Sequence, residues 1–143
     1  METIYPLEDS QELMSTTHNT KITEDLKKFA ETSPSREVCG FVVFKEEGFK
    51  LKKCRNYSPV PEMFEVHPID FLKAKNDKSL VAIFHTHIVG EPKLSDYDLI
   101  CCKEIKIPYL VYSLEMNTFN LYYEDNFEVD LGVIKELEGI ING

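Results

Sequence analysis

The sequence lacks several features that would mark whole classes of protein. No cluster of Lys and Arg offsets its formal net charge of −9, so we expect no surface that binds nucleic-acid phosphates. Its apolar runs are far shorter than the ~20 residues of a membrane span, so we expect none. The first residues, METIYPLEDSQELM, are acidic and lack the apolar region of a signal peptide. We therefore expect a protein that works in a cytoplasm.

Cysteine pairs with the CxxC spacing are also missing. The four cysteines are Cys39, Cys54, Cys101 and Cys102, a spacing that argues against a zinc ribbon. Without a secretory signal, we expect reduced thiols, at least some of them in the core.

What is present fits one globular domain. The chain has 143 residues, of which 43% are hydrophobic and 29% charged, enough for one domain with one core. Residues 1–19 are polar and irregular and include Pro6, which predicts a flexible N-terminal arm. Residues 20–143 are predicted to form the single domain.

Hydrophobic periodicity and turn residues predict a mixed α/β (α+β) arrangement. Helices are predicted over residues 23–32, 68–74, 95–105 and 129–141, and strands over residues 37–44, 50–55, 80–84, 109–114 and 119–123. A short extended piece is expected at residues 64–66. Strands and helices alternate with hairpins and one crossover, which predicts a mixed sheet packed between helices.

Two histidines follow directly on the apolar run at residues 80–84. In a strand, residues i and i+2 point to the same face, so His85 and His87 project together. Two imidazoles on one rigid edge make a clamp for a divalent metal. For the pair alone, the favoured interpretation is a solvated strand end that happens to carry two histidines.

A serine and an aspartate follow at the start of the next predicted helix. Ser95 and Asp98 form a variant of the capping box, with Asp in place of Glu or Gln, and this role alone would explain both residues. A helix that starts beside the end of the preceding strand would also bring Asp98 to His85 and His87. Two His and one carboxylate form a zinc ligand set with a fourth position left open, which is typical of catalytic sites.

Glu37 would be a solvated strand start if it stood alone. Together, Glu37, His85-Thr86-His87 and Ser95-x-x-Asp98 resemble the JAMM motif of the JAB1/MPN/Mov34 metallopeptidases, in the short Glu-x-Cys-Gly form of the prokaryotic and phage branch. The likeness covers roughly residues 20–125. It departs from the family at Ile88, where proline is usual, and this leaves the conformation of the following loop open.

The resemblance implies an MPN/cytidine-deaminase-like fold and roles for five residues. His85, His87 and Asp98 would bind one Zn²⁺, Glu37 would act as general base and acid, and Ser95 would donate a hydrogen bond to the oxyanion. The implied reaction is zinc-dependent hydrolysis of a peptide or isopeptide bond, with a cell-wall peptide or a ubiquitin-like conjugate as substrate. A nucleophilic Cys39 is conceivable, but this reaction needs none, and we interpret Cys39 as a packing residue.

A narrower resemblance points to phage tails. Cys54-Arg55-Asn56, the segment Phe64-Glu65-Val66-His67-Pro68 with Asp70, and Ile107-Pro108-Tyr109 resemble the N-terminal domain of lambda-type phage tail-tip assembly proteins. This narrower resemblance implies phage tail proteins as partners. It also implies two possible locations, a cytoplasm and the virion tail. Two alternatives to an active peptidase therefore stay open, a non-catalytic MPN scaffold and a tail-assembly component.

Overall fold

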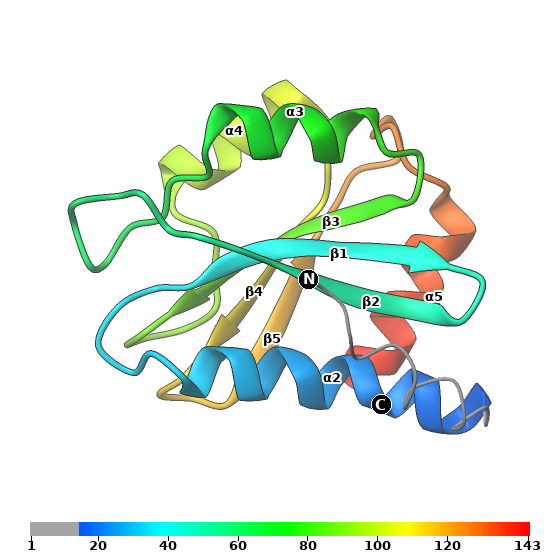
Figure 1. Ribbon diagram of the computed structural model, residues 1–143, viewed down its shortest axis with the longest axis horizontal. Coiled ribbons are helices and arrows are strands. Elements are labelled where there is room, and N and C mark those ends of the chain that lie inside the picture. Colours follow the sequence, from blue (N-terminus) through cyan, green and yellow to red (C-terminus); the bar gives the residue numbers. More distant parts are fainter. Residues whose placement is uncertain (1–14) are drawn as a thin grey trace.

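A five-stranded mixed sheet forms the centre of the computed structural model, which describes residues 15–143 and their side chains from residue 21 onward (Figure 1). Described residues form helices α2 (Ser15–Glu31), α3 (Pro68–Asn76), α4 (Asp96–Ile105) and α5 (Leu131–Asn142). The strands are β1 (Cys39–Lys45), β2 (Gly48–Cys54), β3 (Leu80–His87), β4 (Tyr109–Ser113) and β5 (Thr118–Tyr122). The predicted mixed α/β class, a sheet between helices, is confirmed.

The strands lie in the order β2-β1-β3-β4-β5. Neighbouring strands are antiparallel except β3 and β4, which run parallel and are joined through α4. A parallel pair needs a crossover connection, and here the crossover passes over one face of the sheet. The carboxyl end of β3, with its two histidines, therefore lies next to the start of α4.

Helices cover both faces of the sheet. Helices α3 and α4 lie on one face, and α2 and α5 on the other (Figure 1). Successive strand residues alternate between the two layers: Phe84 and Leu110 pack with α2 and α5, while Ile83 and Tyr109 pack in the cluster with Cys102 of α4. His85 has the same parity as Ile83, so it faces the side of α3 and α4.

Glycine is required where β1 and β2 approach each other. A Cβ atom at Gly40 would lie 2.6 Å from the carbonyl oxygen of Lys52, a distance that side chains do not tolerate. The close approach of the β2 backbone therefore accounts for glycine at this position.

Several predicted boundaries differ from the structure. Helix α2 begins at Ser15 instead of near residue 23, and the buried Ile22 lies in the part that the prediction left out. Strand β3 continues to His87, since its backbone pairs with β4 as far as Ser113 whatever side chains it carries. The segment 64–66 joins no strand. Residues 1–14 lie outside the described part of the chain, so the flexible arm at residues 1–19 and the single domain from residue 20 stay predictions.

No helix in the described part of the chain is long and apolar enough to cross a membrane.

Candidate metal centre

The two histidines of the predicted motif lie on the same face at the end of β3. His85 pairs with Cys39 on one side and with Val111 on the other, which fixes its backbone at the centre of the sheet. The side chain of His85 is 1% exposed, whereas His87 is only half-buried. Their ring centroids lie 5.3 Å apart, so the strand brings the two imidazoles together as the i and i+2 spacing predicts.

The buried ring of His85 carries two polar atoms, Nδ1 and Nε2. Among the residues that the structure describes, neither its Nδ1 nor its Nε2 has a hydrogen-bond partner. Nε2 lies 3.3 Å from Oδ2 of Asp98 and is not hydrogen-bonded to it. A fully buried polar group without a partner is costly, and a bound ion is one of its recognised explanations. The ring of His85 therefore fits a group that binds at Nε2.

The ring of His87 is held by a backbone contact. Its Nδ1 lies 2.9 Å from the carbonyl oxygen of Glu91, which can only accept, so Nδ1 carries the proton and donates it. In the neutral ring, Nε2 then carries a free lone pair. A backbone carbonyl that fixes the tautomer in this way is the usual support for a metal-binding histidine.

The carboxylate of Asp98 lies in the first turn of α4. Ser95 is the N-cap of this helix, with its Oγ accepting from the backbone N–H of Asp98 at 3.0 Å. In return, Oδ2 of Asp98 accepts from the backbone N–H of Ser95 at 3.4 Å. The predicted capping box is confirmed, and the same Oδ2 is the atom that faces His85.

Burial and neighbouring charge set the protonation states of this pair. Burial lowers the pKa of His85 despite the opposing effect of Asp98, so the imidazole is neutral. Burial alone would raise the pKa of Asp98, but His85 and Ser95 outweigh it, and the carboxyl stays ionised. Neutral imidazole and carboxylate are the forms that bind metal.

These three side chains could hold a metal ion. One ligand atom from each of His85, His87 and Asp98 lies within 4.8 Å of the others. Nitrogen and carboxylate oxygen suit zinc among other divalent metals, and three protein ligands leave a position for water or substrate.

Glu37 lies just before β1 at the same end of the sheet. The backbone of Val38 donates to Oγ1 of Thr86 and accepts from its N–H, so the antiparallel register leads Glu37 toward His87. Glu37 is 6% exposed. Its burial raises the pKa of the carboxyl to about 8, and the charges of Asp98 and Glu62 act in the same direction. A carboxyl with a pKa near neutrality can both accept and donate a proton.

Two residues at the site were noticed in the sequence only as part of the phage-type resemblance. The ring of Phe64 stacks on His85, with centroids 4.1 Å apart and planes inclined by 20°. Asn56 donates from Nδ2 to the carbonyls of Glu37 and Met63, each at 2.9 Å. Asn56 also accepts through Oδ1 from the backbone N–H groups of Ser58 and Glu65. No sequence periodicity could signal either contact, because both depend on how the loop at residues 55–67 folds over the sheet.

Cys39 does not have the properties of a nucleophile. It is fully buried, and burial raises the pKa of its thiol to about 12. A neutral thiol at ordinary pH is a packing group. Its Sγ lies 3.8 Å from the carbonyl oxygen of Arg55.

Comparisons with known proteins bear on this site. The chain is 36% identical to desampylase from Pyrococcus furiosus over 86 residues, which are 56% of this chain and 61% of that protein. It is 33% identical to tail tip assembly protein K of Escherichia phage N15 over 79 residues, which are 54% of this chain and 32% of that protein. The match thus spans less than two thirds of either relative. No protein-family model matches the chain.

The fold has a counterpart among solved structures. A protein from Desulfitobacterium hafniense, solved in solution, superposes with a TM-score of 0.55 at 18% identity, covering 79% of this chain and 94% of the other. At that identity the likeness concerns the fold alone. The two sequence relatives, at modest identity, support a relationship of this chain to JAMM/MPN proteins.

Proposed function

We propose that this protein is a zinc-dependent JAMM-type metallopeptidase or isopeptidase that hydrolyses an amide bond. The observation that carries the proposal is the buried ring of His85, whose nitrogens have no hydrogen-bond partner among the described residues. It lies next to His87 and Asp98, and the three ligands match a catalytic zinc set. The likeness to desampylase supports a hydrolase.

Each residue of the motif has a role in this proposal. His85, His87 and Asp98 would hold one Zn²⁺, which supplies Lewis acidity and a nucleophile usable at neutral pH. Glu37 takes up the proton released by the nucleophile and passes it to the leaving amine. Ser95 accepts the capping N–H with a lone pair of Oγ, so its own hydroxyl proton remains free for the oxyanion. Capping and catalysis are therefore chemically compatible in Ser95.

The proposed substrate is a peptide or protein, either a cell-wall peptide or a ubiquitin-like conjugate. A role with phage tail proteins, in the host cytoplasm or in the virion tail, is the second candidate, and the likeness to the tail tip assembly protein favours it. A non-catalytic scaffold is the alternative to both.

Metal content and cleavage test the proposal together. Protein purified without chelator is assayed for bound metals by mass spectrometry, and then incubated with cell-wall peptides and with ubiquitin-like fusions. We expect one zinc per chain and cleavage of one substrate class, with His87→Ala losing both. Zinc without cleavage of either class would favour the scaffold or the tail component, and a protein that binds no zinc under loading conditions would refute the metallopeptidase.

A further inference from the structure

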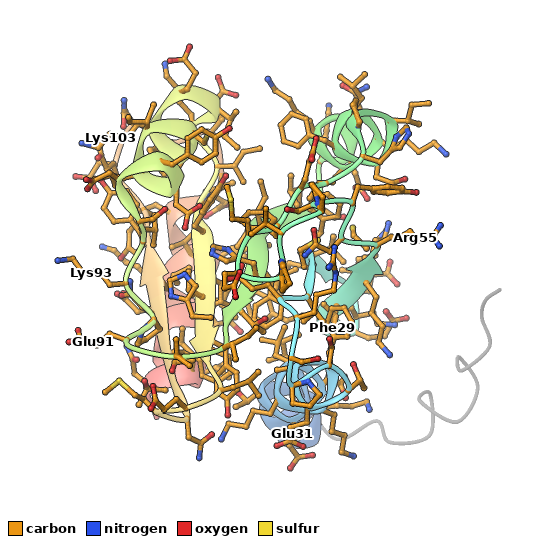
Figure 2. All side chains as sticks on the ribbon, turned by 90° about the vertical axis from the view of Figure 1, so that its left-hand side faces the viewer. Phe29, Glu31, Arg55, Glu91, Lys93 and Lys103 are labelled. Carbon is orange, nitrogen blue, oxygen red and sulfur yellow. The ribbon has the colours of Figure 1, made fainter. Side chains whose placement is uncertain are left out.

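The loop between β3 and α4 is held in place by the turn between β4 and β5. This loop, residues 88–95, carries Glu91, whose backbone carbonyl orients His87. Figure 2 shows Glu91 and Lys93 on this loop, with their side chains directed away from the sheet. The loop therefore contacts His87 through its backbone, and the conformation of that backbone determines the position of the His87 ring.

Both peptide groups of Gly90, one residue before Glu91, are bound by the end of β4 and the turn that follows it. Its carbonyl oxygen accepts from the hydroxyl of Ser113 at 2.5 Å. Its N–H donates to Oε1 of Glu115 at 2.6 Å. Gly90 has a φ of +82°, in the left-handed region that favours glycine, so the loop turns sharply at this residue.

Ser113 is well placed to carry this contact. It is the last residue of β4, pairs in register with His87 on the neighbouring strand and is fully buried. Leu114, which follows it, donates its N–H to the carbonyl of His87 at 2.9 Å. The Oγ of Ser113 also accepts from the N–H of Met116 at 3.0 Å, so the hydroxyl ties the turn and the loop together.

We infer that Ser113 and Glu115 are positioning residues for the metal ligand His87, acting through Gly90 and the carbonyl of Glu91. This inference rests on the proposed zinc site. Without these two contacts, the loop could shift and release Nδ1 of His87, and the ring would lose its fixed tautomer. They also supply a restraint in the loop where Ile88 replaces the usual proline. Supports of this kind behind a metal ligand are typically worth about 10–100-fold in metal affinity.

Zinc affinity is the test, measured by competition with a chromophoric chelator on the full chain. We expect Ser113→Ala to bind zinc about 10-fold or more weakly than the wild type. Glu115→Ala should weaken binding as well, while Glu115→Gln, which loses the charge but keeps an acceptor oxygen, should recover most of the affinity. The matched control is Glu46→Ala, which removes an exposed carboxylate from the β1–β2 turn and should leave the affinity unchanged.

Three outcomes would overturn the inference. Wild-type affinity in both Ser113→Ala and Glu115→Ala would show that the turn does not support His87. A Glu115→Gln variant as weak as Glu115→Ala would assign the effect to charge and not to the hydrogen bond. A wild-type protein that binds no zinc would remove the proposed function first and this inference with it. Should Ser113→Ala fail to fold, the two Glu115 variants still decide, because their side chain is exposed.

Discussion

Replacing Glu37 by glutamine should stabilise the metal-free protein at high pH and strongly lower the turnover of the zinc-loaded protein. The carboxyl of Glu37 is 6% exposed, and burial together with Asp98 and Glu62 raises its pKa from 4.5 to about 8. Between these two values the unfolded chain has lost the proton that the folded protein still holds. The folded state therefore binds more protons, and its stability falls as the pH rises from about 5 to 8. Glutamine does not ionise, so the stability of Glu37→Gln should not fall over this pH range on account of residue 37.

The pKa shift sets an upper limit on the gain. At 1.36 kcal/mol per pKa unit, a rise from 4.5 to about 8 corresponds to a ceiling of about 5 kcal/mol. Water penetration and local relaxation give buried sites an effective dielectric constant well above that of a dry interior, so we expect a gain of about 1–3 kcal/mol at pH 8. At pH 5 the wild-type carboxyl is protonated in the folded state, and the two proteins should differ little.

Urea unfolding of the EDTA-treated proteins at pH 5 and pH 8 measures this difference. The titration of His85 is common to both proteins and cancels in the comparison. Glu46→Gln, a change in an exposed carboxylate, serves as the control and should shift stability at neither pH. Turnover of the zinc-loaded variant should fall by about 10²–10⁴, the usual contribution of a general acid–base group. Parallel stability profiles for wild type and Glu37→Gln would refute the reasoning, because they would show that Glu37 folds as a hydrated carboxylate.

Three other substitutions test separate parts of the structure. Ser95→Asp should keep α4 folded and zinc bound, since Asp is as good a cap as Ser, but should lose about 10²–10³ in turnover because an ionised carboxylate cannot donate to the oxyanion; wild-type turnover would leave Ser95 as a cap alone. Asn56→Ala removes four hydrogen bonds and should lower the free energy of unfolding by about 2–4 kcal/mol. A single hydrogen bond contributes at least roughly 0.5 kcal/mol, so a loss below that value would show that Asn56 does not anchor the loop. Hydrogen bonds from Ser79 lower the pKa of Asp77 to about 2, so Asp77→Ala should cost about 1 kcal/mol at pH 7 after discounting for its partial exposure, and this cost should vanish as the pH falls from about 4 to 2.

Local rules were enough to predict the chemical groups of the candidate site. The i and i+2 spacing of a strand places His85 and His87 on one face, and the capping box places Asp98 at a helix start. Both patterns depend on neighbours within a few residues, so the sequence carries them fully.

Contacts between distant segments could not be predicted in the same way. The stacking of Phe64 on His85 requires a loop without regular structure to fold back over β3. The support of Gly90 by Ser113 requires the parallel register of β3 and β4, which pairs His87 with Ser113. Hydrophobic periodicity identifies β3 and β4 as strands, but it contains no information about which residue of one lies beside which residue of the other.

The capping box and the proposed metal site use the same carboxylate oxygen, and this explains why the sequence left two interpretations of Asp98 open. Oδ2 of Asp98 accepts from the N–H of Ser95 and also faces Nε2 of His85. The N-terminus of α4 carries a partial positive charge that helps to keep this carboxylate ionised beside a buried imidazole. Capping alone does not account for the position of this carboxylate against a histidine whose nitrogens, in the described part of the chain, have no hydrogen-bond partner. Conversely, a ligand in an unstructured loop would lose conformational entropy when it became ordered around a metal, and this loss would weaken binding. Because the helix start fixes the carboxylate before any ion arrives, the capping interaction is itself part of the preorganisation of the site.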